Sequence, residues 1–129
     1  MNGGICLVAG LLLAQFGDQI TLRWTHSIQK TAWEEDYRRD GDALRLIAAR
    51  VRGTGAGMEP PPGAVLRDGA WHYSPAIPPL PRLELHHSPH TAPYVVCSAG
   101  TCRPVTEWLP GLPAEAVLEL APCAADGRK

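Results

Sequence analysis

A histidine and a glutamate near the start of the chain are the first candidates for a functional pair of side chains. Every second residue over 20–24 is apolar, so these residues share one face of a predicted strand, and His26 continues that row. Across a turn, Glu35 shares a face with Trp33 and Tyr37, and the aromatic rings indicate that this face points inward. A carboxylate beside aromatic rings is costly unless it is paired, so the sequence predicts that Glu35 pairs with His26 in a polar pocket.

The same pair has a second interpretation, in which it is purely structural and fixes the turn between the two strands. Lys30 is the second candidate partner for Glu35. Burial alone would raise the pKa of the carboxyl group and lower that of the histidine, whereas mutual pairing would act the other way on both. The functional interpretation assigns binding to the turn, to a glycine-rich segment and to a later histidine: His26, Ser27, Lys30, Thr31, Glu35, Gly55, Gly57, Met58, Glu59 and His87.

The arrangement of these residues disfavours nucleophilic catalysis. Ser27 adjoins His26, and neighbouring residues of a strand point to opposite faces, so we expect no direct contact between nucleophile and base. The chain also contains no G-x-S-x-G sequence, which in hydrolases presents the serine on a sharp turn. We therefore assign no catalytic residues and no cofactor, and we favour a non-enzymatic function.

A histidine cluster over 86–90 raises the alternative of a transition-metal site. His86 and His87 face opposite ways on a strand, which leaves His87 with His90, joined by His26 if the two regions meet. These imidazoles would make the chain a metal-binding protein or a metal-dependent enzyme. The simpler interpretation is a polar turn with exposed histidines and no metal.

The glycine-rich segment 53–59 matches neither a dinucleotide-binding fingerprint nor a P-loop, because its third glycine is misplaced and no Lys-Ser/Thr pair follows. Its successive N–H groups can instead receive an anion such as a neighbouring carboxylate. The alternative is a flexible connection at a corner of the sheet.

Four cysteines, at positions 6, 97, 102 and 123, allow three pairings if all of them are oxidised. The spacing of Cys97 and Cys102 suits a bond across a tight turn, while Cys6 and Cys123 lie at opposite ends of the chain, and chain ends often meet. This favoured pairing would imply an oxidising compartment. The alternative is four buried thiols in a cytoplasmic protein, and a zinc site is disfavoured because two C-x-x-C pairs are absent.

The apolar run from Ile5 to Ala14 imitates the core of a signal peptide but lacks a basic residue before it and a small-x-small cleavage site after it. It is also shorter than the roughly 20 residues that span a bilayer. We interpret the run as an interior strand bent at Gly10, and we expect the chain not to span a membrane. A signal or an anchor is the alternative.

Short strands are expected to carry most of these residues. Thirteen glycines and thirteen prolines divide the 129 residues into short pieces. Asp40-Gly41 and Asp68-Gly69 lie between apolar runs and predict tight hairpin turns. The predicted strands cover 20–25, 33–38, 43–51, 64–67, 70–73, 83–87, 92–97, 102–108 and 116–120.

The fold class that follows is all-β. We expect one domain over 1–129, an antiparallel sandwich or partly open barrel of about eight short strands, with frayed residues at 1–4 and 124–129. A helix over 43–52 is the alternative to a strand there, because three apolar residues recur at helical spacing.

A sequence pattern that occurs twice in the chain, an internal echo, predicts a two-fold structural pseudo-repeat. The pattern Leu-x-Trp-x-His-Ser at 22–27 is matched by Leu-x-Leu-x-His-Ser at 83–88, and a Thr-Ala pair follows each copy. If the repeat is structural, His26 and His87 occupy equivalent corners.

Charge excludes two classes of protein. A formal net charge of −1, from 12 basic and 13 acidic residues, fits neither a basic nucleic-acid binder nor an acidic disordered tail. We therefore expect no nucleic-acid partner, and we expect the four tryptophans to pack in the core instead of stacking on bases.

Four sequence motifs are similar to those of other proteins: Trp-Thr-His-Ser-Ile-Gln-Lys-Thr at 24–31, Trp-Glu-Glu-Asp-Tyr at 33–37, Gly-Ala-Gly-Met-Glu-Pro at 55–60, and Tyr-Val-Val-Cys at 94–97 with Cys102-Arg103. Together they resemble a bacterial family of small proteins of unknown function. Members of that family are commonly encoded beside tripartite ATP-independent periplasmic (TRAP) transporters of the TAXI type. The resemblance implies an accessory role in secondary solute uptake outside the inner membrane, and it implies no catalytic residues.

We therefore expect an accessory or binding module whose partner is a TRAP transporter subunit, a solute-binding protein or the solute itself. The contacts would come from the His26–Glu35 end and from the segment 55–59. The expected location is periplasmic or otherwise extracytoplasmic, and a cytoplasmic location is the alternative because a conventional signal peptide is not recognisable.

Overall fold

The computed structural model describes residues 3–25, 31–52 and 63–124, and these residues form an almost entirely β structure. One short helix, α1 (Val105–Trp108), follows a strand directly. The eleven strands of the described part are β1 (Ile5–Ala9), β2 (Leu12–Phe16), β3 (Gln19–Thr25), β4 (Ala32–Asp40), β5 (Ala43–Arg52), β6 (Val65–Arg67), β7 (Ala70–Tyr73), β8 (Leu83–His87), β9 (Val95–Ser98), β10 (Thr101–Pro104) and β11 (Ala116–Pro122).

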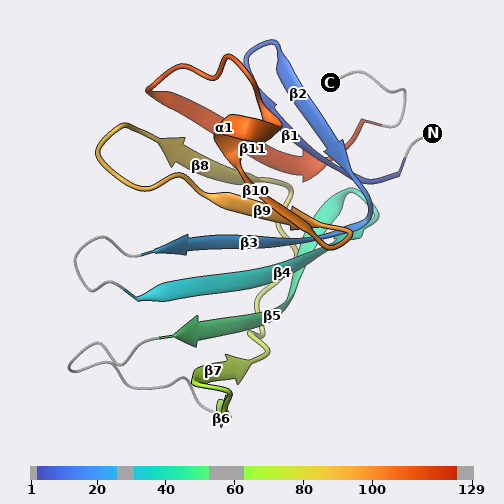
Figure 1. Ribbon diagram of the computed structural model, residues 1–129. Coiled ribbons are helices and arrows are strands. Elements are labelled where there is room, and N and C mark those ends of the chain that lie inside the picture. Colours follow the sequence, from blue (N-terminus) through green and yellow to red (C-terminus); the bar gives the residue numbers. More distant parts are fainter. Residues whose placement is uncertain (1–2, 26–30, 53–62, 125–129) are drawn as a thin grey trace.

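The strands form two sheets, which Figure 1 shows with their labels. The smaller sheet has the order β2-β1-β11-β8, and the larger has the order β10-β9-β3-β4-β5-β7-β6. All pairings within the two sheets are antiparallel, and in the described part neither sheet closes on itself as a barrel. The predicted antiparallel sandwich is therefore confirmed, with more strands than the eight or so that we expected.

The core lies where the inner faces of the two sheets meet. In the smaller sheet, Ile5 and Leu7 of β1 and Leu118 and Leu120 of β11 are completely buried. The larger sheet and α1 complete this core with Ile20, Leu22, Tyr37, Leu44, Leu46, Val96 and Val105. Burial of so many branched apolar side chains on facing strands is the main force that holds the sheets together.

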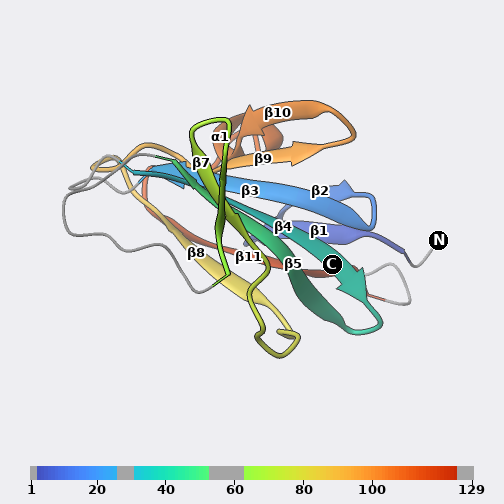
Figure 2. The ribbon, with the colours of Figure 1, turned by 90° about the horizontal axis from the view of Figure 1, so that it is seen from below.

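The larger sheet is strongly twisted. Figure 1 shows β7 and β6 at the end of this sheet that is farthest from β1 and β2, and Figure 2 looks at the molecule from that end. In Figure 2 the strand direction turns progressively from β3 through β4 and β5 to β7, as right-handed strand twist requires.

The Asp-Gly pairs form hairpins, as predicted. Asp68 and Gly69 are the two turn residues between β6 and β7, and both have positive φ, which two-residue turns of type I′ require. The β4–β5 turn lies one residue later than expected: Asp40 still pairs with Ala43, and Gly41 has positive φ at the first turn position.

The apolar run at the start of the chain is a hairpin, not one bent strand. Ala9 of β1 pairs with Leu12 of β2, so Gly10 and Leu11 form the turn, and Gly10 has a φ of 59°. Gly4, which we expected at a frayed end, is buried and accepts hydrogen bonds at its carbonyl oxygen from Arg39 Nη1 and the Cys123 backbone N–H.

A β-bulge explains why 43–52 has apolar residues at helical spacing although it forms strand β5. Asp36 of β4 pairs with Ala48 while Tyr37 pairs with Leu46, so Ile47 is an extra residue without a pairing partner of its own. The inward positions move from even to odd numbers at that point, and Ala49 follows Leu46 on the inner face three residues later. The helical alternative is therefore wrong.

The predicted strand at 102–108 is only half a strand. β10 ends at Pro104, which has no N–H to donate to a ladder, and the chain turns into α1. Val105 is completely buried there and donates its backbone N–H to the Tyr94 carbonyl, while Trp108 Nε1 donates to the Val96 carbonyl. These inward contacts favour the helical turn over continued pairing.

The two copies of the internal echo have different topologies. The first copy enters the hairpin of β3 and β4 inside the larger sheet. The second leads from β8, which pairs with β11 in the smaller sheet, to β9 in the larger sheet. The described strands therefore do not form the predicted pseudo-repeat, because the first copy continues within one sheet and the second crosses between the sheets. The predicted equivalence of His26 and His87 depends on His26, which lies outside the described residues.

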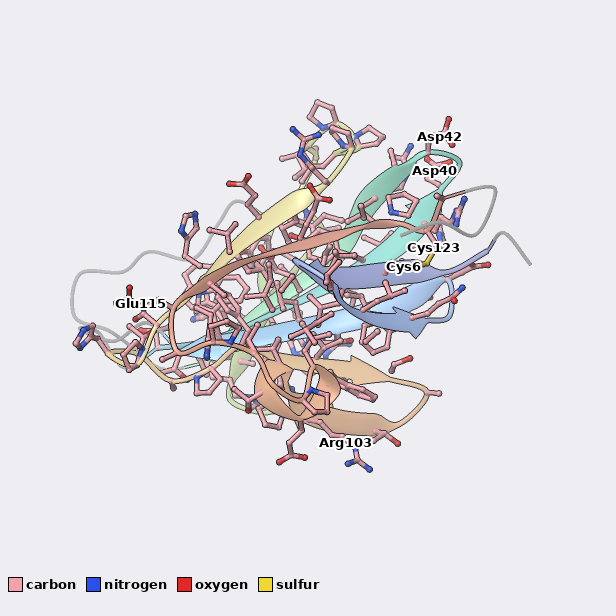
Figure 3. All side chains as sticks on the ribbon, turned by 90° about the horizontal axis from the view of Figure 1, so that it is seen from above. Cys6, Asp40, Asp42, Arg103, Glu115 and Cys123 are labelled. Carbon is pink, nitrogen blue, oxygen red and sulfur yellow. A yellow bond between two sulfur atoms is a disulfide. The ribbon has the colours of Figure 1, made fainter. Side chains whose placement is uncertain are left out.

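Both disulfides of the favoured pairing are present. Cys97 and Cys102 are directly opposite each other on β9 and β10. Cys6 of β1 is bonded to Cys123, immediately after β11, and Figure 3 shows this bond at the same end of the molecule as Asp40 and Asp42. Two such bonds are typical of proteins in oxidising compartments.

Candidate functional site

Glu35 lies on the inner face of the larger sheet, as its position in the strand predicted. It pairs across the ladder with Leu22, and the next inward pair on one side is Trp24 with Trp33. Ile20 and Leu22 are almost completely buried, which confirms the inward direction of the β3 row. The Trp24 and Trp33 rings stack with their centroids 6.0 Å apart, so the carboxylate is followed along the strands by an aromatic pair.

Glu35 forms part of the wall of a cavity of about 330 Å³ between the two sheets. The cavity combines side chains of β3 and β4 with those of β8, the edge strand of the smaller sheet. Figure 1 shows the ends of β3 and β8 and the start of β4 at the same end of the molecule. Its lining residues are three aromatic residues, three leucines and two glutamates: Trp24, Tyr37, Tyr94, Leu22, Leu83, Leu85, Glu35 and Glu84.

The carboxylate of Glu35 is held by a tyrosine. Tyr37 donates a hydrogen bond from its hydroxyl group to Glu35 Oε1, with 2.6 Å between the oxygens. Burial raises the pKa of Glu35 above its usual value, and the hydrogen bond from Tyr37 offsets part of that rise. In the described part of the chain, no ion pair involves Glu35.

Burial and the negative charge of Glu35 raise the pKa of three tyrosines. Burial raises the pKa of Tyr37, and its hydrogen bond to Glu35 and the negative charge there raise it further. Burial and the same charge also raise the pKa of Tyr73 and of Tyr94. All three hydroxyl groups therefore stay protonated around neutral pH and can donate hydrogen bonds.

The two neighbouring carboxylates have the opposite environment, because they lie on the outer face of the sheet. Arg50 contacts both Glu34 and Asp36 at 2.8 Å, and Arg23 is also 2.8 Å from Glu34. Burial alone would raise the pKa values of Glu34 and Asp36, but the hydrogen bonds and charge of Arg50 bring both below their usual range. Glu35 lacks a comparable cation among the described residues, which separates it from this structural network.

Besides Glu35, the predicted binding residues fall into two groups. Thr31 is completely buried just before β4, and His87 is partly buried at the end of β8, on the same face as Leu83 and Leu85 but outside the lining of the cavity. The other predicted binding residues lie outside the described part of the chain: His26, Ser27, Lys30, Gly55, Gly57, Met58 and Glu59.

The alternative metal set cannot be assembled from the described residues. Within 3–25, 31–52 and 63–124, no group of three or more His, Cys, Asp or Glu side chains is arranged to hold a metal ion. His90 is exposed, and its backbone N–H lies 3.2 Å from the Ser88 hydroxyl group. His26, the third histidine of that set, lies outside the described residues.

Sequence reasoning missed the β8 side of the cavity. Leu83 and Leu85 alternate in a predicted strand, so their common face could be found, but nothing in the sequence shows that β8 lies across from β3 and β4. Tyr94 was included in the predicted strand 92–97 but follows Pro93 in the connection from β8 to β9, before β9 begins. Its contact with Trp24, at 6.1 Å between ring centroids, depends on the chain crossing between the sheets.

Comparison with known protein families matches residues 20–105, well over half of the chain, to a domain of unknown function, DUF1850. The chain belongs to the DUF1850 family. The matched residues extend from β3 to the first residue of α1 and include all residues that line the Glu35 cavity. Comparisons with curated proteins and with solved structures give no significant match.

Among helices in the described part, none combines the length and apolar character needed to cross a membrane.

Proposed function

We propose that this DUF1850 chain is a non-enzymatic accessory module of a TAXI-type TRAP uptake system, and that the Glu35 cavity binds a transporter subunit or its solute. The observation that carries the proposal is the half-buried Glu35 carboxylate in a mostly apolar cavity, held by Tyr37. A perturbed acid in a concave, mainly apolar site is a typical feature of binding sites.

Three further observations support this role. The sequence resembles small proteins encoded beside such transporters, and the two disulfides fit a periplasmic location. One hydrophobic core includes residues of both sheets, so we take the chain as a single domain. His26 and the segment 55–59 stay part of the proposed contact surface, together with Glu35.

The test measures binding and folding in the same variants. Oxidised protein carrying Glu35→Gln or His26→Ala is titrated by calorimetry with the purified transporter subunits, the solute-binding protein and the solute. We expect the affinity for one of these partners to fall about tenfold or more. Removing one member of a buried polar contact leaves its partner group desolvated and unpaired in the complex, which typically costs at least that much affinity. The thermal unfolding midpoint should not decrease in parallel.

Glu107→Gln is the matched control, since Glu107 is an exposed carboxylate on α1 whose nearest cation is Arg103 at 3.7 Å. It removes the same charge at a residue that does not line the cavity and should leave binding unchanged. Equal affinity for the wild-type protein and Glu35→Gln, or a joint loss of folding and binding, would show that the predicted pair of His26 and Glu35 is only structural.

A further inference from the structure

The chemical character of the cavity indicates a ligand class more specific than a transporter subunit or solute. Two of its lining residues, Glu35 and Glu84, carry carboxylates, and none of the described lining residues is basic. The charge that complements such a cavity is positive. Glu84 also lies 3.9 Å from His86 on the exposed edge of β8, so Glu35 is the carboxylate directed to the interior.

Three aromatic residues line the same cavity as Glu35. Trp24, Tyr37 and Tyr94 all line the cavity, and the Trp24 and Tyr94 rings are inclined at 50° to each other. Alkylammonium and quaternary ammonium groups are recognised in cavities that combine inclined aromatic rings with a carboxylate, because the ring faces are negative and the carboxylate supplies the counter-charge.

The apolar wall limits the ligand further. Leu22, Leu83 and Leu85 supply the rest of the surface, which favours a cation that also carries hydrocarbon over a hydrated metal ion. A volume of about 330 Å³ is at the small end of the range for ligand sites, so the ligand is a small molecule or a single side chain.

We infer that the Glu35 cavity is a site for a small organic cation, with Glu35 as the counter-charge and Trp24, Tyr37 and Tyr94 as the ring faces around its ammonium group. This inference rests on the proposed binding function and names the ligand class for the same cavity. Tyr37 positions the carboxylate through its hydrogen bond, and the leucines contact the hydrocarbon part of the ligand.

The experiment compares three probes of nearly equal size that differ in charge: choline, its neutral analogue 3,3-dimethylbutan-1-ol, and the anion 3,3-dimethylbutanoate. n-Butylammonium is added as a primary ammonium probe. Binding to the oxidised full chain is followed by nuclear magnetic resonance, with the Trp24 indole signal assigned through a Trp24→Phe variant. We expect the cations to bind at least about tenfold more tightly than the neutral analogue and the anion not to bind.

Two variants assign the preference to the cavity. Glu35→Gln should remove the preference of the cavity for cations over the neutral analogue, whereas Glu107→Gln, which removes a carboxylate outside the cavity, should keep it. Unchanged amide spectra outside the cavity show that each variant is folded.

The outcomes separate this inference from the proposed function. If the neutral analogue or the anion binds the cavity as well as the cations do, the ligand class is wrong while a binding function persists. If no probe binds but Glu35→Gln still weakens capture of a transporter subunit, the cavity recognises that subunit in another way, and the inference is again overturned. If neither probes nor subunits depend on Glu35, both proposals fail.

Discussion

The charge on Glu35 opposes folding, and the charges on its two neighbours support it. The pKa of Glu35 is raised in the folded chain, so its ionisation removes stability as the pH rises from its usual pKa of 4.5 through the raised value. The pKa values of Glu34 and Asp36 are lowered. The stability that Glu34 and Asp36 contribute is fully present above their usual pKa values of 4.5 and 3.8, and it is lost as the pH falls through their lowered pKa values.

We therefore predict that Glu35→Gln is more stable than the wild-type protein at pH 7, by up to about 1 kcal/mol after allowance for solvent screening. The glutamine still accepts the hydrogen bond from Tyr37 but has no charge to desolvate. Urea unfolding at several pH values measures the difference, which should shrink toward zero below about pH 4, where the carboxyl group is neutral in both states. A variant that is less stable than wild type at pH 7 would contradict this account of the raised pKa.

Ala99 occupies a backbone conformation that suits other residues better. It is the first turn residue between β9 and β10, with a φ of 51°, and Gly100 follows with a φ of 84°. Type I′ turns of this kind favour Asn-Gly or Asp-Gly, because residues with a Cβ and no local hydrogen bond are strained at positive φ.

Ala99→Asn should raise the free energy of unfolding by about 0.5–1 kcal/mol. Asp68→Ala is the converse change, because Asp68 has a φ of 53° in the equivalent turn of β6 and β7, and it should lower stability by a similar amount. Urea unfolding with both disulfides intact measures the two effects. Changes of the same sign would refute the argument from turn geometry.

At the level of the element, the bulge in β5 makes a deletion testable. Removing Ile47 would pair β4 with β5 without an extra residue and would keep Leu44, Leu46, Ala49 and Val51 on one face. We predict that the deletion variant folds, with a loss of about 1–2 kcal/mol. Circular dichroism and urea unfolding provide the measurement.

The control deletion removes Arg23 from β3, which pairs with β4 in one continuous register. Losing one residue there would move Trp24 to the outer face, and we expect that protein not to fold. Two deletions with the same effect would show that the bulge does not set the register of β5.

The strands were the part of the structure most open to prediction. Alternation predicted β3, and the Asp-Gly pairs predicted the β6–β7 turn at Asp68-Gly69 and the β4–β5 turn one residue too early, because strand period and turn chemistry are local properties. The errors came from features that local pattern does not contain. The bulge at Ile47 imitated helical spacing, and the contact of Val105 with the core turned the end of a predicted strand into α1.

At the level of the whole molecule, the candidate site could likewise be predicted only where it depends on local sequence patterns. The inward direction of Glu35 follows from strand parity alone. The other wall of the cavity follows from the path of the chain between the sheets, which brings β8 and Tyr94 to β3 and β4. No local pattern specifies that path, so only the Glu35 side of the cavity was predictable.

The two disulfides should contribute very different amounts to the stability of the whole molecule. Cys6 and Cys123 are 117 residues apart in sequence, whereas Cys97 and Cys102 are five apart. Loop entropy predicts a loss of about 4–5 kcal/mol for Cys6→Ala with Cys123→Ala, and of about 2 kcal/mol for Cys97→Ala with Cys102→Ala. Urea unfolding of the two double variants measures both losses, and equal losses would contradict the loop-length argument.

The bond between Cys6 and Cys123 also decides how the molecule bears tension. A pull on the two ends of the chain passes directly from one sulfur to the other, so all strands from β2 to β11 lie outside the line of load. Stretching the oxidised protein would therefore leave the chain between the two cysteines folded. Once that bond is reduced, the same pull acts on β1 and β11 at the centre of the smaller sheet, and the fold itself has to resist it.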